Sequence, residues 1–334
     1  MPHCGFFHDD VERGELMANR QGTAQTTLRD AVVIAGIGVH GGKPASMTLH
    51  PAEAGTGIVF QRLDASGASS VSIRATIDCL HATESCTTIA SMGLSVATIE
   101  HLLAAFSGLG LDNVIVEIDG PEVPMMDGSA AAFVALIDSV GLAPLAASRR
   151  FIKVLKPVRV DNGASFAELL PFDGRRFEID IEFSSALIGR QSFAIDLTPH
   201  NFRRDLARAR TFGFLKDVEF YMSRGLALGS SLENTVVLGD DRVLNPEGLR
   251  FADEFARHKT LDAVGDLALA GAPILGAYRS YRGGHKLNAK MVEALLADSD
   301  AWTFVGDFAE PRRQPVRAEI PVRLREAAFG PDKS

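Results

Sequence analysis

The sequence predicts an α+β protein built from two similar halves, and three observations lead to this prediction. A chain of 334 residues is long enough for two domains of common size. Its composition, 46% hydrophobic and 23% charged, is that of a globular protein with a buried core. Each half also shows the same order of patterns, in which several strands are followed by a helix, a strand and a second helix.

The first half is expected to span residues 25–145, after a polar, aperiodic segment over residues 1–24 that is typical of a flexible extension. A helix is predicted over residues 98–107, because Thr98 suits an N-cap and Gly108 ends the pattern. An apolar stripe predicts a second helix over residues 129–140. Strands are predicted over residues 28–39, 45–50, 57–62, 71–77 and 113–118.

The second half is expected to span residues 150–300. Residues 141–150 contain Gly141, Pro144 and small side chains, and form the predicted boundary. Residues 301–334 are expected to form a C-terminal tail. The elements predicted in this half are strands over 154–160, 165–169, 177–183 and 274–281, and helices over 253–270 and 287–297.

An insertion near residues 203–238 has no counterpart in the first half. It is rich in large apolar side chains, among them Phe212, Phe214, Phe220 and Met222. Two interpretations stand side by side: the core of an ordinary subdomain, or an apolar groove for a lipid or a partner.

Composition and charge exclude several classes of function. The net charge of −8 and the lack of a basic stripe argue against a nucleic-acid partner. No apolar run approaches the roughly 18 residues of a membrane-spanning helix. Three cysteines without a C-x-x-C pair exclude a disulfide framework and a cysteine-only zinc site. Four acidic residues stand near the N-terminus, where a signal peptide would be apolar, so a cytoplasmic protein is expected.

Residues 36–41 match G-x-G-x-x-G, the dinucleotide-binding fingerprint, directly after a predicted strand. That site needs a helix N-terminus behind the glycines to hold the pyrophosphate. Here Lys43 and Pro44 lead instead into residues 46–50, which alternate with a period of two. The sequence therefore predicts a hairpin at this point and not a nucleotide site.

Histidines and carboxylates gather on two of the predicted helices. His258 and Asp262 are spaced i, i+4 and share one helix face, which Asp266 extends by a turn. Such a stripe beside apolar residues is costly to bury unless something pairs with it. A cation is one possible partner, and a salt bridge with Lys259 or Arg257 is the other interpretation.

The other helix begins with Glu100 and His101. Two histidines and one aspartate from two helices would make a three-ligand zinc site with an open fourth position. Glu100 could then accept the proton of a zinc-bound water. His285 follows two glycines on a loop, as expected of a general acid, and Asp266 could orient its ring.

Seven stretches together resemble one family. In this chain they are residues 36–43, 97–105, 111–129, 209–214, 249–259, 261–266 and 284–288. The Glu-His-Leu, Arg-His-Lys-x-Leu-Asp-x-x-Gly-Asp and Gly-His-x-Leu-Asn segments are the most specific. They resemble the zinc-dependent UDP-3-O-acyl-N-acetylglucosamine deacetylases of lipid A biosynthesis. The resemblance implies two α+β domains, with the helices sandwiched between two sheets.

The resemblance also implies roles for individual residues. His101, His258 and Asp262 would ligate Zn²⁺, Glu100 would be the general base, and His285 would protonate the departing amine. Asp266 would hold His285, Thr211 would stabilise the oxyanion together with the metal, and Asp127 is a weaker outer candidate. The insertion would form the passage for the acyl chain. The residues then expected to bind substrate are Lys259, Arg282, Phe212 and Phe214.

By this resemblance the chain would hydrolyse the N-acetyl group of UDP-3-O-(3-hydroxyacyl)-N-acetylglucosamine and release acetate, the committed step of lipid A biosynthesis. The substrate is its expected partner, with transient association with the inner membrane and a monomeric state. Two alternatives stay open: another metal-dependent amidohydrolase, and a zinc-stabilised binding protein without turnover.

The sequence departs from the family pattern at three places. Arg282 stands where the family often has lysine, which keeps the charge but changes the donor geometry. Ser185 and Ala186 replace a His-Pro pair, which puts substrate contacts there in question. The extension over residues 1–24 has no match. Cys86 is either a core cysteine or a ligand to a second, inhibitory zinc.

Overall fold

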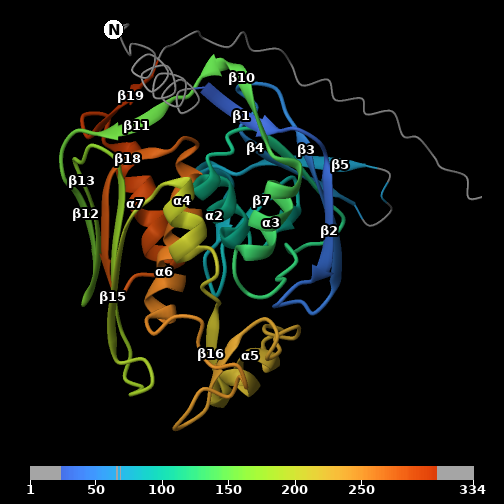
Figure 1. The fold of residues 1–334 in the computed structure, drawn as a ribbon, viewed down its shortest axis with the longest axis vertical. Coiled ribbons are helices and arrows are strands. Elements are labelled where there is room, and N and C mark those ends of the chain that lie inside the picture. Colours follow the sequence, from blue (N-terminus) through green and yellow to red (C-terminus); the bar gives the residue numbers. More distant parts are fainter. Residues whose placement is uncertain (1–23, 65–66, 68, 307–334) are drawn as a thin grey trace, which may run out of the picture.

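A computed structural model of the chain describes residues 24–64, 67 and 69–306. Residues 1–23 of the predicted extension and residues 307–334 of the predicted tail lie outside the described residues. Two large β-sheets enclose a layer of helices (Figure 1). The predicted α+β class, with helices between two sheets, is confirmed.

The first sheet has five strands in the order β2-β3-β9-β4-β5. Its residues alternate between the helix layer and solvent, as in β3, where Ala45, Met47 and Leu49 are buried. The strands are β2 (Val32–Ile37), β3 (Pro44–Pro51), β4 (Ile58–Leu63), β5 (Ser70–Arg74) and β9 (Val114–Ile118).

The second sheet has seven strands and comes from the second half of the chain. It consists of β11 (Phe151–Val154), β12 (Val158–Asn162), β13 (Ser165–Leu170), β14 (Arg175–Glu182), β15 (Arg190–Asp196), β18 (Ile274–Tyr281) and β19 (Trp302–Val305). β19 falls within the predicted tail, yet it pairs antiparallel with β11 and so extends this sheet to Val305.

The two sheets share one topology, which confirms the two similar halves. In the first, β9 runs antiparallel to β3 and parallel to β4, and β2 and β5 complete two hairpins. In the second, β18 runs antiparallel to β13 and parallel to β14, and β12 and β15 complete the hairpins. The segment predicted as the boundary forms β10 (Leu142–Ser148), which pairs with β1 (Ala24–Leu28). The exact division into domains stays a prediction.

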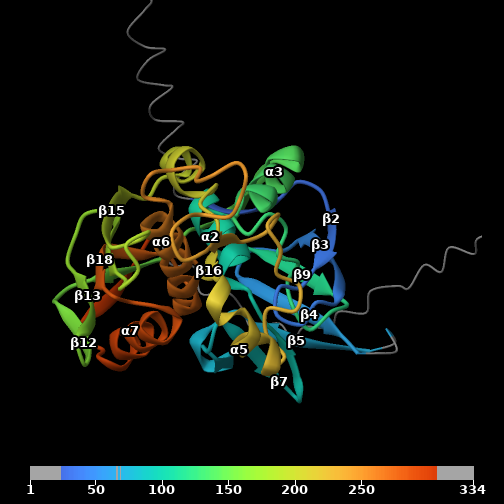
Figure 2. The ribbon, with the colours of Figure 1, turned by 90° about the horizontal axis from the view of Figure 1, so that it is seen from below.

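The helix layer contains α2 (Glu100–Leu109), α3 (Ala131–Val140), α6 (Glu254–Asp266) and α7 (His285–Ala297). Both views place α2 beside α6 at the centre of the molecule (Figures 1 and 2). Gly265 permits this close approach, because a Cβ there would overlap the Glu100 carbonyl oxygen. The first turn of α2 thus lies directly against α6.

The Gly-rich segment over residues 36–41 ends β2 and begins the turn into β3. Gly38 N donates to Lys43 O over 2.9 Å, and Gly42 N donates to Gly38 O over 3.0 Å. The predicted hairpin is therefore confirmed, and no helix N-terminus stands behind these glycines.

The insertion contributes small elements at one end of the molecule (Figure 1). β16 (Phe212–Phe214) and β17 (Val236–Leu238) pair in parallel, with the one-turn η3 (Leu215–Asp217) and α5 (Val218–Ser223) between them. Upstream of β16 stand α4 (Pro199–Asn201) and η2 (Phe202–Leu206). Apolar side chains that the structure leaves exposed in this region are Leu215, Phe220, Tyr221, Met222, Leu228 and Leu232.

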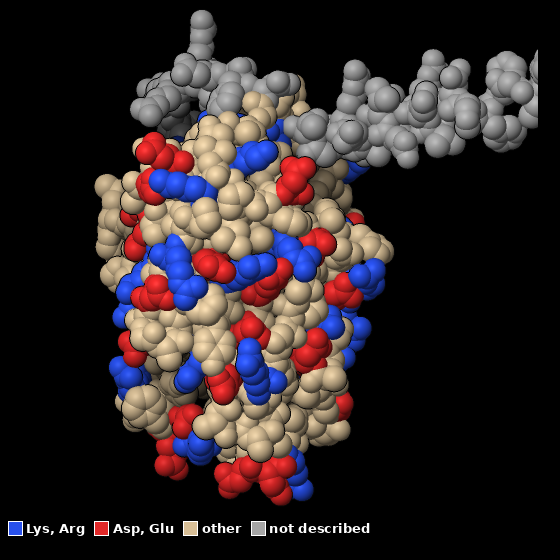
Figure 3. All heavy atoms as spheres, turned by 90° about the vertical axis from the view of Figure 1, so that its left-hand side faces the viewer, with Lys and Arg blue, Asp and Glu red and all other residues tan. Residues whose placement is uncertain are grey.

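Shorter elements complete the described chain: η1 (Ile77–Cys79), β6 (Leu80–Ala82), β7 (Thr88–Ser91), β8 (Leu94–Val96) and η4 (Leu267–Ala270). On the face over the second sheet, basic and acidic side chains are interspersed (Figure 3). Many of them pair, as Arg176 does with Glu178 and Asp196. Within the described residues, no helix combines the length and apolar character needed to cross a bilayer.

Candidate metal centre

The three predicted metal ligands lie together where α2 meets α6. The side chains of His101, His258 and Asp262 are buried, and one possible ligand atom from each lies within 4.8 Å of the other two. Asp262 Oδ1 is 3.4 Å from His101 Nε2 and 3.3 Å from His258 Nε2. One helix supplies the first histidine and the other supplies the remaining two ligands, as the sequence predicts.

This donor set fits a metal ion. Asp262 Oδ1 is buried and accepts no hydrogen bond from the described residues, which is unusual for a carboxylate oxygen. His258 Nδ1 lies 3.1 Å from Ala209 O. Because that contact needs a proton on Nδ1, the lone pair of Nε2 points toward Asp262, as in outer-shell support of metal-binding histidines.

Local electrostatics keep the cluster in a metal-binding protonation state. Burial lowers the pKa of His258 to about 3, so the imidazole is neutral at pH 7. Burial opposes ionisation of Asp262, but His258 and Lys259 hold its pKa well below the usual range. Lys259 Nζ donates to Asp262 Oδ2 over 2.8 Å. Burial works against the charged ammonium, yet Asp262 raises the pKa of Lys259. The salt bridge with Lys259, the other interpretation of this helix face, is therefore present at Asp262 Oδ2. Asp262 Oδ1 has no hydrogen-bond partner among the described residues.

Glu100 is held beside this cluster at the first turn of α2. Its Oε2 accepts a hydrogen bond of 3.0 Å from Thr87 N. Its Oε1 lies 4.0 Å from His285 Nε2. Burial raises the pKa of Glu100, which His285 partly offsets. A buried carboxylate with a raised pKa and one oxygen facing an imidazole is suited to proton transfer.

His285 is fixed by a network of polar side chains. Its Nδ1 lies 2.9 Å from Asp266 Oδ2, which also accepts a 2.8 Å hydrogen bond from Asn288 Nδ2. The other oxygen, Asp266 Oδ1, accepts a 2.6 Å hydrogen bond from Thr87 Oγ1. Burial lowers the pKa of His285, but the charges of Asp266, Asp262 and Glu100 outweigh it and raise the pKa to about 9.

Thr87 and Asn288 are two members of this network that the sequence analysis did not select. Asn288 stands inside the stretch 284–288 that carried the family resemblance, three residues after His285, whereas Thr87 follows Cys86 outside those stretches. Hydroxyl and amide side chains of this kind are common throughout a sequence, so only the fold shows that these two meet Asp266.

Aromatic side chains of β16 lie beside the cluster and contact Phe183. Phe212 packs with ring centroids 6.2 Å from His258 and 5.6 Å from Phe183. The ring centroid of Phe214 lies 6.3 Å from that of Phe183, with the two rings tilted. Thr211 comes directly before β16, where its N donates to Gly128 O over 2.8 Å. Lys259 Nζ is 5.7 Å from the Phe212 ring centroid, so the ammonium and the aromatic surface are neighbours.

The other residues singled out in the sequence differ in their exposure and in their contacts. Arg282 is exposed at the end of β18 with φ of 52°. Cys86 is buried, and burial with the nearby charge of Glu100 raises the pKa of its thiol to about 11, so it is protonated at pH 7. Asp127 pairs with Arg250 at 2.8 Å. The buried Nδ1 of His40 has no hydrogen-bond partner among the described residues.

Comparisons with known proteins identify the family of the chain. The family described as UDP-3-O-acyl N-acetylglycosamine deacetylase (LpxC) matches residues 25–297. Proteins named UDP-3-O-acyl-N-acetylglucosamine deacetylase from Brucella ovis, Brucella canis and Brucella melitensis are each 53% identical to the chain over 282 residues. Each match covers 84% of this chain and 98% of the relative. The chain therefore belongs to the UDP-3-O-acyl N-acetylglycosamine deacetylase family.

Proposed function

We propose that this chain is a zinc-dependent deacetylase that hydrolyses the N-acetyl group of UDP-3-O-acyl-N-acetylglucosamine, a step of lipid A biosynthesis. Family membership supports the reaction and the substrate. The observation that carries the proposal is the buried cluster of His101, His258 and Asp262, with Glu100 and His285 beside it. A purely structural metal site would not need this second pair of titratable groups.

Zinc is the proposed ion, held by His101, His258 and Asp262. Two imidazoles and one carboxylate form a ligand set typical of catalytic zinc. When bound, the ion would supply a Lewis acid for the acetamide carbonyl and would lower the pKa of a water ligand. Lys259 holds the second oxygen of Asp262 and so fixes the orientation of this carboxylate.

Glu100 is the proposed general base. Thr87 N holds one carboxylate oxygen, which leaves the other free to accept the proton of the attacking water. Burial raises the pKa of Glu100, and a base is most effective when its pKa approaches the working pH. Before the transfer, the charge of the nearby His285 imidazolium stabilises the Glu100 carboxylate and so partly offsets the effect of burial.

His285 is the proposed general acid and Asp266 is its positioning residue. The carboxylate holds Nδ1 and stabilises the imidazolium, so Nε2 can deliver its proton to the leaving amine nitrogen. The C–N bond of the acetamide then breaks, and acetate and the free amine leave. Thr211 is proposed to donate to the developing oxyanion from the start of β16.

The substrate-binding roles extend from the same site. The apolar rings of Phe212 and Phe214, which both contact Phe183, offer a surface for the acyl chain. Lys259 and the exposed Arg282 are proposed to face the charged groups of the substrate. Exposed Phe220 and Met222 on α5 support a brief contact with the membrane that holds the acylated substrate. The proposal includes a monomeric protein that works in the cytoplasm.

Acetate release from UDP-3-O-(3-hydroxyacyl)-N-acetylglucosamine tests this proposal. We expect release by the zinc-loaded chain, loss after chelation and recovery when zinc is added back. A folded, zinc-loaded sample that releases no acetate would refute the proposed substrate. Release that persists at the same rate after complete metal removal would refute the proposed zinc chemistry.

A further inference from the structure

A second pocket lies between the two sheets, away from the metal centre. It has a volume of about 230 Å³ and is lined from both halves of the chain. Ser107 and Leu111 line it from the C-terminal end of α2, and Leu267 lines it just after α6. Along α2, Ser107 stands about 10 Å from Glu100 at the helical rise per residue. The pocket therefore adjoins the C-terminal ends of α2 and α6, the two helices that carry the proposed metal ligands.

The charge of this pocket is strongly positive in a chain whose net charge is −8. Arg74, Arg149, Arg150 and Arg175 line it. Asp112 is the single acidic side chain among the described residues that form its wall. It is already engaged, because its Oδ2 accepts hydrogen bonds of 2.9 and 2.7 Å from Arg149 Nε and Nη2. The described residues add no second carboxylate to the wall.

Arg175 lies deepest in this charged set. Nη1 donates to Ser107 O over 2.9 Å and Nη2 to Ser107 Oγ over 2.6 Å, and both acceptors are neutral. Nε is buried and has no hydrogen-bond partner among the described residues. Burial, together with the nearby charge of Arg149, lowers the pKa of Arg175 to about 10, although the charge of Asp112 opposes this shift without forming an ion pair with Arg175. A buried guanidinium without a carboxylate is costly.

One ordinary explanation is that Arg175 caps the C-terminus of α2. The partial negative charge there is about half an elementary charge and would stabilise one cation. Arg149 also donates to a carbonyl at this helix end, Gly110 O. Two arginines thus share that half charge, and Asp112 neutralises only one of them. Capping therefore leaves a positive excess in the pocket.

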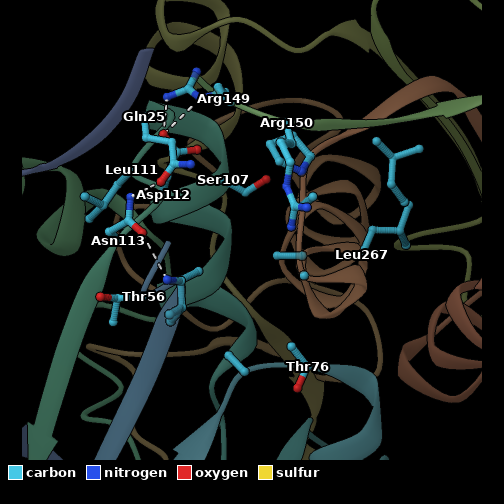
Figure 4. A pocket seen from close by; sticks show the side chains of 18 of the residues that line it. Gln25, Thr56, Thr76, Ser107, Leu111, Asp112, Asn113, Arg149, Arg150 and Leu267 are labelled. Carbon is cyan, nitrogen blue, oxygen red and sulfur yellow. Dashed lines mark hydrogen bonds and ion pairs between the residues drawn. The ribbon is translucent and has the colours of Figure 1, made fainter. Parts of the chain in front are cut away.

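The remaining lining residues are suited to contact the uncharged part of a small organic anion. Figure 4 shows Gln25, Asp112 and Asn113 on one side of the pocket and Arg150 and Leu267 on the other. Apolar side chains, including Ile58, Phe177 and Ile274, add to the wall. Thr76 also lines the pocket, and its buried hydroxyl has no partner among the described residues.

We propose that this pocket binds a small organic anion through a phosphate or carboxylate group. Guanidinium groups recognise both oxyanions with paired, charge-assisted hydrogen bonds. Arg150 and Arg74 are exposed at the rim and would receive the ligand, while Arg175 offers its unpartnered Nε from within. The site is separate from the metal centre, so it would regulate or stabilise the protein without entering the reaction.

Calorimetric titration of the full, zinc-loaded chain tests this proposal, with pyrophosphate and succinate as separate probes at constant ionic strength. Saturable binding of either probe supports the site, and the probe that binds identifies the preferred group. Arg175→Met and Arg150→Gln should each weaken binding about tenfold or more, the effect of a lost charged hydrogen bond. Binding should persist in His258→Ala, which removes a metal ligand and leaves the pocket unchanged.

Arg176→Met is the matched control. Arg176 is the next residue of β14, so its side chain points to the other face of the strand, where it pairs with Glu178 and Asp196. This variant should bind like the unmodified chain. The proposal is overturned if neither probe binds saturably up to about 10 mM, or if the probes bind equally well to Arg175→Met and Arg150→Gln. Because Arg150 is exposed, its variant keeps the test valid should Arg175→Met fail to fold.

Discussion

His285 Nδ1 lies 2.9 Å from Asp266 Oδ2, and this contact sets the charge of the imidazole. The same carboxylate oxygen accepts a hydrogen bond from Asn288, while Thr87 occupies the other oxygen. Asp266 therefore cannot rotate away without losing two further hydrogen bonds. The ring of His285 is held in one orientation, with Nε2 directed toward Glu100 and Asp262.

The first prediction concerns the alkaline limb of the pH–rate profile. His285 must be protonated to act as the acid, so activity should fall as the pH rises through its pKa. Burial lowers that pKa, but Asp266 and the other carboxylates raise it to about 9. A cation bound nearby would lower the pKa of His285, so the alkaline limb should lie at about pH 9 or below. Asp266→Asn should move the limb to lower pH, measured as kcat/KM against pH. An unchanged limb would contradict the role of Asp266.

The second prediction separates catalysis from metal binding at Glu100. Glu100→Gln keeps the shape of the side chain but removes its basicity, so turnover should fall by about 100-fold or more. Metal content should stay near that of the unmodified chain, since Glu100 is not in the ligand cluster. Acetate release and elemental analysis on the same sample measure both quantities. Near-normal turnover in this variant would exclude Glu100 as the base.

The third prediction concerns the metal ligands. His258→Ala removes one of three ligands, so zinc affinity should fall by more than the roughly 10–100-fold that the loss of an outer hydrogen-bond partner costs. The control is His200→Ala, which removes an exposed histidine beside Arg204. Competition with a zinc-binding dye reports the affinity of each variant. Equal affinities in both variants would rule out His258 as a ligand.

The fourth prediction concerns the contact between α2 and α6. Gly265→Ala would place a methyl group on the backbone carbonyl of Glu100, and neither helix can yield easily because both are buried. The free energy of unfolding should fall by about 1–3 kcal/mol or more. Gly213→Ala is the control, because nothing lies within 4 Å of a Cβ at that position. Denaturant unfolding measures both, and equal stability would contradict tight packing at Gly265.

Much of this fold could be predicted because the sequence patterns are local. The ends predicted from Thr98 and Gly108 lie within two residues of those of α2, but both signals were wrong, because Ile99 precedes the helix without a side-chain cap and Gly110, not Gly108, ends it. The predicted strand over 274–281 coincides with β18. The i, i+4 spacing of His258 and Asp262 brought them to one face of α6. Periodicity reports such features directly, because it depends only on neighbours along the chain.

Features that depend on distant parts of the chain could not be predicted in this way. β10 pairs with β1 across more than a hundred residues, and its segment resembled a linker because its residues are small. Thr87, directly before β7, meets Asp266 only after this segment has packed against the end of α6. The surplus of positive charge around Arg175 arises from residues scattered between Arg74 and Arg175, so no charge run in the sequence revealed it.

The division of the proposed metal ligands between α2 and α6 has a consequence for how the protein matures. During synthesis the first sheet and α2 are complete long before Asp262 leaves the ribosome. Until then the chain offers a single histidine of the three ligands and can hold an ion only weakly. Tight capture of the ion would thus report that both halves have been made and have docked correctly. A truncated or half-folded chain would lack part of this ligand set and would bind the ion only weakly.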